Sequence, residues 1–337
     1  MTKKRNIIVG IIKWINSIFG ILLLFAYTIP YLEPKNIGIL AIMSIFTPVL
    51  ILINIAFVIY WLIQLKKEIF ISLVILLIGF NSINRLYTYN NKSSTANFSI
   101  MSYNVRGFNI YKWTNDENIA GKISNFIKEK SPDVVCFQEF YNDKNLNFKQ
   151  YPYHYIKGSS KTEKFGQAIF SKYQIINTGS LDFKDTANNA IFIDILKNND
   201  TLRIYNVHLQ SLKVNKLAKN VTENKEKIAK QISNAYKKQQ EQVLQLVAHK
   251  KTCPYKTIIC GDFNNTAFSY SYKQLATNMQ DTFTVKGTGF GKTFSAFVFP
   301  FRIDFILASN DLKVKSFKTY STINYSDHKA VEAKFDL

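Results

Sequence analysis

The sequence predicts an α/β fold that is preceded by transmembrane helices. Three observations support this prediction: long apolar runs fill residues 1–95, nine short apolar runs recur between turn signals from residue 98 onward, and helical patterns lie between them. Hydrophobic residues make up 47% of the 337 residues and charged residues only 20%, which excludes a disordered or collagen-like chain. The chain must therefore bury a core, span a bilayer, or do both.

The longest apolar run covers residues 37–65 and contains no charged residue over 29 positions. A transmembrane helix needs about 20 mostly apolar residues, because its backbone groups must be hydrogen-bonded internally. Residues 14–29 are a second candidate, for which a cleaved signal peptide is the alternative. We favour a retained span, since no small-residue cleavage site follows before Pro30. Residues 69–87 are a third candidate, weaker because polar residues dilute the second half.

The basic residues around these spans predict their orientation. Lys3, Lys4 and Arg5 precede the first span, and Lys66 and Lys67 follow the second. Because Lys and Arg accumulate in short cytoplasmic loops, we expect these segments inside the cell. Three spans then place everything after residue 90 outside the cytoplasm, whereas two spans would reverse the result. We therefore expect a multi-pass protein of the cell membrane with an extracytoplasmic C-terminal domain.

The polar segment 90–97 (NNKSSTAN) predicts a linker between two units. We expect a membrane domain of about three transmembrane helices at residues 1–89 and a catalytic domain at residues 98–337. Expected strands are residues 98–104, 133–138, 167–171, 190–196, 202–208, 256–260, 302–309, 314–320 and 330–335, and expected helices are residues 118–130 and 224–248. Strands that alternate with helices predict a layered α/β sandwich.

The net charge is +20 for the whole chain and +13 after residue 95. A positive charge of this size suits nucleic acid or an anionic membrane surface, although biased residue usage explains it equally well. The Lys-rich stretch 212–242 is either a phosphate-binding face or a solvated surface, and its interspersed Glu residues favour the second interpretation. Three cysteines without a metal-binding pattern support neither a disulfide framework nor structural zinc.

Polar residues gather at the carboxyl ends of the expected strands, where α/β folds usually present reactive groups. They are Asn104, Gln138, Glu139, His208, Asp262, Asn264, Asp304, Asp327 and His328. Each residue alone is usually a turn or capping residue. Together, carboxylates, carboxamides and imidazoles without thiolates predict an oxygen-ligand site for Mg²⁺, with Mn²⁺ as the alternative. The metal would neutralise phosphoryl charge, a carboxylate would orient or deprotonate water, and a histidine would donate a proton.

The motifs GDFN, QE, NVH, RID and SDH, which contain these residues, carry a family resemblance. The chain resembles the deoxyribonuclease I-like endonuclease/exonuclease/phosphatase superfamily, as a membrane-anchored member of bacterial type. This superfamily includes abasic-site endonucleases, neutral sphingomyelinases and inositol polyphosphate phosphatases, and the resemblance covers about residues 98–337. It implies a four-layer α/β sandwich, with two packed, mainly antiparallel sheets flanked by helices, and a hydrolase for phosphoester bonds.

The resemblance also implies a metal site. Glu139 matches the family's metal-binding glutamate, and Asn104 matches the asparagine that arranges metal and phosphate. Asp327 matches the aspartate at or near the metal. The cofactor implied by these residues is Mg²⁺, or Mn²⁺.

Five further residues match catalytic positions of the family. Asp262 matches the aspartate that activates or positions the attacking water, and Asn264 steadies the same group. His328 matches the phosphate-contacting histidine, and Asp304 matches the carboxylate that orients it. His208 resembles a second histidine that acts as general acid, and either histidine is a candidate for the critical proton transfer. The expected substrate-binding residues are Asn104, His208, Asn264 and His328.

The leading hypothesis is therefore a membrane-anchored, Mg²⁺-dependent phosphodiesterase with endonuclease-like character. Nucleic acid is one substrate class, favoured by the positive charge. A phospholipid headgroup is the other, favoured by the anchor, and it corresponds to a sphingomyelinase-like lipid phosphodiesterase. A binding module that keeps the fold without turnover is a further alternative. The lipid bilayer is an expected partner, and the sequence identifies no protein partner.

Overall fold

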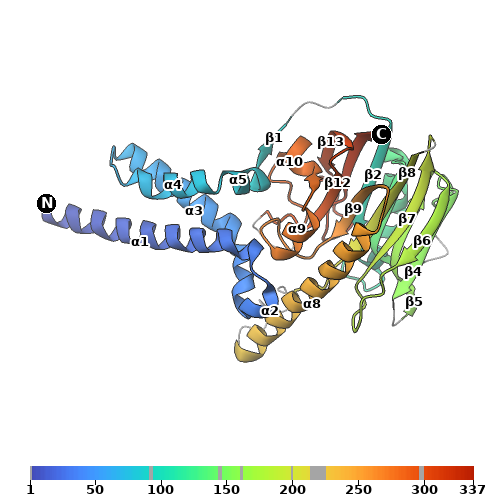
Figure 1. Ribbon diagram of the computed structural model, residues 1–337, viewed down its shortest axis with the longest axis horizontal. Helices are drawn as coiled ribbons and strands as arrows, with labels where there is room; N and C mark the ends of the chain where they lie inside the picture. The colour runs from blue at the N-terminus through green and yellow to red at the C-terminus, as the bar shows by residue number, and fades with distance from the viewer. Residues whose placement is uncertain are drawn as a thin grey trace.

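The computed structural model describes residues 2–90, 94–142, 146–159, 162–198, 200–212, 225–295 and 300–337. Two six-stranded sheets pack face to face, and a helical arm that begins at the N-terminus extends to one side of them (Figure 1). Parts of the expected linker (91–93) and of the Lys-rich stretch (213–224) lie outside the described residues.

The first sheet has the order β13-β14-β2-β3-β5-β4. Its strands are β13 (Lys313–Thr319), β14 (Val331–Asp336), β2 (Phe98–Asn104), β3 (Val134–Tyr141), β5 (Thr162–Ser171) and β4 (Tyr153–Ser159). The second sheet has the order β10-β12-β9-β8-β7-β6. Its strands are β10 (Met279–Asp281), β12 (Asp304–Ser309), β9 (Lys256–Asp262), β8 (Asp200–His208), β7 (Asn189–Lys197) and β6 (Ile175–Ser180).

Each sheet contains one parallel pair, β2–β3 or β8–β9, and its other neighbouring strands run antiparallel. A short pair, β1 (Thr88–Tyr89) and β11 (Thr288–Gly289), joins the chain before the first sheet to the loop before β12. The prediction of two packed, mainly antiparallel sheets is confirmed. All nine expected strands are present.

The strands that the sequence analysis missed are β4 and β6 at sheet edges, the three-residue β10, and the short pair β1 and β11. Three central positions of β6 are exposed. An edge strand of this kind has little apolar alternation, so hydrophobic periodicity does not detect it.

Alternating side chains divide the strands between three apolar layers. In β9, Ile258 and Cys260 point between the two sheets, while Ile259 points to the outer face beneath α8 (Lys225–Lys251) and α9 (Tyr270–Leu275). Alternate side chains of a strand face opposite sides of a sheet, so one strand contributes to two layers. The four layers are therefore helix, sheet, sheet and helix.

Helix α6 (Ile119–Lys130) covers the outer face of the first sheet. Its buried residues Ile119, Ile123, Phe126 and Ile127 recur at the spacing of one helical face. The helix ends at Ser131, which adopts a left-handed conformation with φ 45°. Two further short elements, η3 (Arg106–Asn109) and α10 (Thr282–Lys286), follow β2 and β10.

The N-terminal arm contains two helical stretches that are long and apolar enough to cross a membrane, Ile7–Tyr31 and Pro34–Ile63. They are built from α1 (Thr2–Thr28), η1 (Ile29–Tyr31), α2 (Pro34–Ile37), η2 (Gly38–Ile42) and α3 (Met43–Ile63). The third expected segment forms α4 (Ile69–Ile78) and α5 (Phe80–Leu86), which meet at a bend of 78°. This pair is a broken span or a re-entrant loop, so the arm contains two candidate spans, or three if the bent pair counts as one.

A buried polar network joins α1, α3 and α4. The side chain of Asn16 donates to Ser72 Oγ over 2.6 Å, and Trp61 Nε1 donates to Asn16 Oδ1 over 2.7 Å. Ser72 Oγ in turn donates to Asn54 Oδ1 over 2.8 Å. All four side chains are fully buried. Since an unsatisfied polar group is costly in an apolar environment, these bonds hold the three helices in one arrangement.

We expect Phe137→Ala to destabilise the two-sheet domain by about 3–5 kcal/mol, the usual cost of deleting a buried aromatic ring. Phe137 is fully buried in the layer beneath α6 and contacts the rings of Phe108, Phe148 and Phe170. Chemical denaturation in detergent measures the change. Phe137→Leu keeps part of the volume and should cost less, so equal losses in both variants would contradict the packing argument.

Candidate active site

Strand register brings three of the expected site residues side by side. In the second sheet, His208 at the end of β8 pairs with Asp262 at the end of β9, and Asp262 pairs with Asp304 at the start of β12. Because β8 and β9 are parallel while β12 is antiparallel to β9, two strand ends and one strand start meet at one edge of the sheet. Residues separated by almost 100 positions thus become neighbours.

The first sheet contributes Asn104 and Glu139 from its own parallel pair. Asn104 at the end of β2 pairs with Gln138 in β3. The β3–β5 register shifts between Phe137 and Phe140, and Glu139 there has a φ of 49°. Gln138 points between the sheets and donates to Asn206 Oδ1 over 2.7 Å. This bulge lets consecutive residues serve different purposes, because Gln138 joins the two sheets while Glu139 reaches the site.

Asn104 links the two carboxylates that face each other across the sheets. Its Nδ2 lies 3.1 Å from Asp262 Oδ2 and 3.4 Å from Glu139 Oε1. Its Oδ1 accepts a hydrogen bond from the backbone N–H of Arg106 over 3.1 Å. Asn104 is thus oriented by the loop that follows its own strand.

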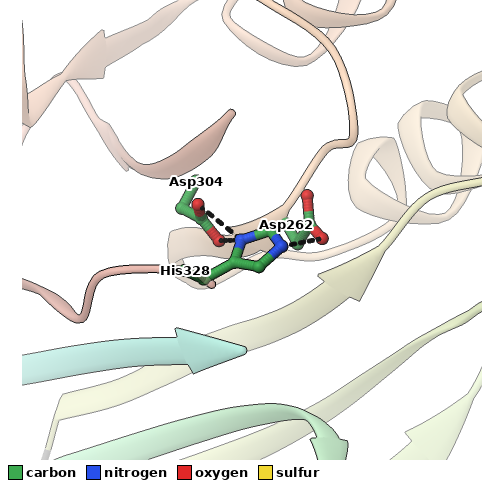
Figure 2. A group of neighbouring side chains, drawn as sticks. All are labelled: Asp262, Asp304 and His328. Atoms are coloured by element: carbon green, nitrogen blue, oxygen red, sulfur yellow. Dashed lines mark hydrogen bonds and ion pairs between the residues drawn. The ribbon is translucent and has the colours of Figure 1, made fainter. Parts of the chain in front are cut away.

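His328 lies between two buried aspartates, as Figure 2 shows. Its Nδ1 is 3.0 Å from Asp304 Oδ2, and its Nε2 is 3.7 Å from Asp262 Oδ2. The ring of Phe294 packs against the imidazole with 4.9 Å between centroids. The geometry orients the ring, since Asp304 engages one nitrogen and leaves the other directed toward Asp262.

Burial and the neighbouring charges shift the pKa values of His328 and Asp262. Burial alone would lower the pKa of His328, but the carboxylates of Asp304 and Asp262 outweigh it and raise the pKa to about 10. Burial raises the pKa of Asp262 to about 7, against the opposing effect of His328. His328 is therefore a cation at neutral pH, with a proton on each ring nitrogen, and a doubly protonated imidazole cannot bind a metal.

His208 has the opposite ionisation. Burial, together with the positive charge of His328, lowers the pKa of His208 to about 3, so its imidazole is neutral. Its Nε2 lies 3.7 Å from Asp262 Oδ2 and 3.9 Å from Glu139 Oε1, which is too far for direct hydrogen bonds. The two histidines of the site thus differ in charge because only His328 has a carboxylate at hydrogen-bonding distance.

Among the described residues, one group of acidic and histidine side chains has the spacing of a metal site: Asp262, Asp304 and His328. Since His328 is protonated, Glu139 and its neighbours provide the more suitable donors. Burial raises the pKa of Glu139, and the charge of Asp327 contributes to this. A divalent cation would offset the cost of burying these carboxylates, and their oxygen donors match the preference of Mg²⁺ or Mn²⁺.

Asn264 and Gly261 shape the loop around Asp262. The backbone N–H of Asn264 donates to Asp262 Oδ1 over 2.7 Å, and its side-chain Nδ2 donates to the carbonyl of Leu209 over 2.8 Å. Asn264 adopts a left-handed conformation with φ 50°. Gly261 has a φ of 141°, and a Cβ there would lie 1.9 Å from the carbonyl oxygen of Val207. Only glycine permits this approach of β9 to β8.

The structure brings together Asn104, Glu139, His208, Asp262, Asp304 and His328, with Asn264 beside Asp262. Asp327 lies at the rim, where its carboxylate pairs with Arg106 Nη1 at 3.1 Å. Sequence analysis missed Arg106, which sits in a loop where residues 106–109 all have positive φ. The sequence feature that could have indicated Arg106 is its position two residues after Asn104.

Two further supporting residues were missed as well. Thr293 Oγ1 accepts hydrogen bonds from the backbone N–H groups of Ile303 and Asp304 over 3.0 and 3.1 Å. Gln239 of α8 donates to the carbonyl of Gln210 over 2.7 Å. Nothing in the local sequence distinguishes these side chains from ordinary polar residues, because their partners lie on other elements.

The chain matches two family models. Residues 101–328 match the model of the Endonuclease/Exonuclease/phosphatase family. Residues 9–86 match a domain of unknown function (DUF8431). No curated protein matches the sequence.

Several solved structures share the fold. A protein of the endonuclease/exonuclease/phosphatase family from Leptotrichia buccalis C-1013-b has 18% sequence identity and a TM-score of 0.52, covering 72% of this chain and 100% of its own. The human Nocturnin catalytic domain with bound sulfate anion has 16% identity and a TM-score of 0.55, covering 74% and 95%. D. rerio TDP2 complexed with single strand DNA product has 17% identity and a TM-score of 0.55, covering 71% and 99%. At these identities the likeness establishes the fold alone.

We expect Asp304→Asn to lower the pKa of His328 by at least about one pH unit, because a neighbouring opposite charge typically shifts a pKa by about 1–3. The pKa falls because the negative charge of Asp304 stabilises the protonated imidazole, and the amide of Asn lacks that charge. NMR titration of the labelled histidine ring measures the change. Asp311→Asn removes the same charge from an exposed turn and serves as control. An unchanged His328 titration in Asp304→Asn would contradict the assigned cause.

Proposed function

Because the chain belongs to the Endonuclease/Exonuclease/phosphatase family, we propose that residues 98–337 form a metal-dependent phosphoester hydrolase that its N-terminal helices anchor in a membrane. The observation that carries this proposal is the convergence of Glu139, Asp262 and His328 at one edge of the two packed sheets. Carboxylates and a cationic imidazole within a few ångströms of one another are suited to attack on a phosphorus centre.

Glu139, with Asn104 and Asp327, would hold the divalent cation, for which we propose Mg²⁺ with Mn²⁺ as the alternative. When bound, the cation supplies positive charge that stabilises the phosphoryl oxygens during attack. Asn104 supports the arrangement because its amide lies between Glu139 and Asp262. Arg106 would keep Asp327 in place through their ion pair.

Asp262 would orient the attacking water and accept its proton. Its pKa of about 7 suits a general base near neutral pH, since a base works best with a pKa close to the operating pH. The backbone N–H of Asn264 holds one carboxylate oxygen and leaves the other facing the site. His328 would donate a hydrogen bond to a phosphoryl oxygen, and Asp304 would maintain both its orientation and its charge.

His208 would contact the phosphate as a neutral hydrogen-bond donor. Its low pKa argues against a resting imidazolium that protonates the leaving group. The ionisation of the two histidines therefore favours His328 as the charged partner of the phosphate. His208 would then contribute orientation more than charge.

Nucleic acid is the first candidate substrate. The +13 charge of the region after residue 95 would attract a polyanion. Among the structural neighbours, TDP2 from D. rerio is complexed with a single strand DNA product.

A phospholipid headgroup is the second candidate, and one contact favours it. Phe268 is buried among apolar residues of the N-terminal helices, six residues after Asp262. An extended segment of that length spans no more than about 22 Å. The proposed base would therefore lie close to the membrane surface, where lipid phosphates are concentrated.

The catalytic domain is proposed to lie outside the cytoplasm. The loop that joins the two candidate spans contacts α8. Gln240 Nε2 donates to Glu33 Oε2 over 3.3 Å, and the backbone N–H of Lys35, at the start of the second span, donates to Gln240 Oε1 over 2.9 Å. The domain must then share a membrane side with this loop, opposite to the loop that contains Lys66 and Lys67. Since basic loops face the cytoplasm, the bent pair α4–α5 would carry the chain back across the bilayer.

We expect the full-length protein in lipid vesicles to hydrolyse phosphodiester bonds only with Mg²⁺ or Mn²⁺, and Glu139→Gln to lower this activity by at least about 100-fold. The reason is loss of the charged oxygen donor from the proposed metal site. Plasmid nicking, phospholipid cleavage and hydrolysis of a phosphate monoester, each with and without chelator, measure the activity and distinguish the substrate classes.

Glu129→Gln is the matched control, because Glu129 is an exposed carboxylate on α6. It should retain full activity. Hydrolysis that persists in Glu139→Gln and in chelator would refute the metal role, and absence of turnover on every substrate would leave a binding module as the better description.

We expect a cysteine at position 96 to react with a membrane-impermeant thiol reagent in intact cells, and a cysteine at position 67 to react only after permeabilisation. Ala96 and Lys67 are both exposed, so the difference reports membrane side alone. A Cys253→Ser background removes the native cysteine that is only partly buried. The reverse labelling pattern would place the catalytic domain in the cytoplasm.

A further inference from the structure

The loop that follows Asp262 is buried against the membrane arm. Thr266 Oγ1 donates to the carbonyl of Ser44 in the first turn of α3 over 2.8 Å. Ser44 Oγ donates to Asn265 Oδ1 over 3.3 Å and shares a 3.0 Å hydrogen bond with Tyr236 of α8. Ser44 is fully buried, and Asn265 and Thr266 are almost completely buried.

Phe268 extends this contact into the arm itself. Its side chain is 4% exposed and belongs to a cluster with apolar residues of α1, α3, α4 and α5: Leu23, Ala26, Leu50, Ile51, Ile75, Leu76 and Leu86. The catalytic domain contributes only Phe268 to the buried members of this cluster, within the described residues. A single aromatic side chain of this domain thus packs in an apolar cluster with helices that could span a membrane.

Hydrogen bonds, together with the peptide bond between Leu209 and Gln210, connect this contact to Asp262. Gln239 Oε1 accepts from Asn265 Nδ2 over 2.8 Å. Gln239 Nε2 donates to the carbonyl of Gln210, two residues after His208. Asn264 completes the connection, since its backbone N–H holds Asp262 Oδ1 and its side chain holds Leu209. Each of these hydrogen bonds is buried or largely buried. Because close-packed interiors transmit strain, a displacement at Ser44 or Phe268 would also move the loop of Asp262.

A second attachment between the two regions bypasses this loop. Strands β1 and β11 pair beyond α5, and Tyr87 packs edge-on against Phe290 with ring centroids 5.1 Å apart. This attachment already ties the domain to the arm. The contacts of Ser44, Thr266 and Phe268 therefore are not required for tethering alone, and their link to Asp262 indicates another role.

We propose that Ser44, Thr266 and Phe268 are positioning residues, through which the membrane arm holds the loop of Asp262 and Asn264 in its reactive conformation. The arm is then part of the active-site support as well as an anchor. This inference rests on the proposed hydrolase function. Because a misplacement of about 1 Å can cost about 100-fold in rate, loosening this loop lowers turnover more than substrate binding.

The test compares kcat and KM of the full-length protein in vesicles, with the substrate that the wild-type protein cleaves. Phe268→Ala and the near-isosteric Thr266→Val are expected to lower kcat by about 10- to 100-fold with little change in KM. Phe268→Leu, which replaces much of the lost apolar volume in the cluster, should restore most of the turnover. Phe290→Ala is the matched control, because it removes the same ring from the second attachment, and it should keep kcat within about twofold.

Hydrogen exchange gives a readout that does not depend on activity. Amides of residues 262–269 should exchange faster in Phe268→Ala and at the wild-type rate in Phe290→Ala. Wild-type kcat in both Phe268→Ala and Thr266→Val, or an equal loss of kcat in Phe290→Ala, would overturn the inference. A wild-type protein that cleaves none of the substrates would instead refute the proposed hydrolase function.

Discussion

Several carboxylates are buried together at one edge of the packed sheets, and the groups around them must compensate their charge. Asp262 and Asp304 are almost completely removed from solvent, and buried negative charge is costly unless a cation or hydrogen-bond donors compensate it. His328 supplies the positive charge, while Asn104 and the backbone of Asn264 supply donors. The raised pKa values of Asp262 and Glu139 show that compensation is incomplete. This residual cost is what the proposed divalent cation would relieve.

The same edge concentrates unusual backbone conformations. Glu139, Asn264 and residues 106–109 all have positive φ, a region that side chains other than glycine adopt at a cost. Paired strands on both sides hold these residues in place, because the regular ladders of β2, β3, β8 and β9 end there. The paired strands thus hold these residues in backbone conformations that they would rarely adopt in a flexible loop.

The N-terminal arm bears on the proposed function in two separate ways. Its buried polar network fixes the arrangement of α1, α3 and α4. Apolar side chains of the same helices form a buried cluster with Phe268 of the two-sheet domain. If the arm positions the loop of Asp262 as proposed, the packing of the N-terminal helices affects the rate of hydrolysis. If the arm spans a bilayer as proposed, this contact would also bring the site near the bilayer surface, which bears on the choice between nucleic acid and a lipid headgroup.

Sequence patterns alone predict the α/β class, nine of the strands, the two long apolar spans and the residues that converge on the site. These features follow from local properties, since apolar periodicity and strand-end polar residues are visible in short windows. Edge strands such as β6 escaped notice because they bury little apolar surface. Short windows of sequence do not reveal that α4 and α5 meet at a sharp bend, that His328 is charged while His208 is neutral, or that Phe268 packs among the N-terminal helices. The reason is the same in each case: burial, charge and packing partners come from residues far away in the chain, and no local pattern contains them.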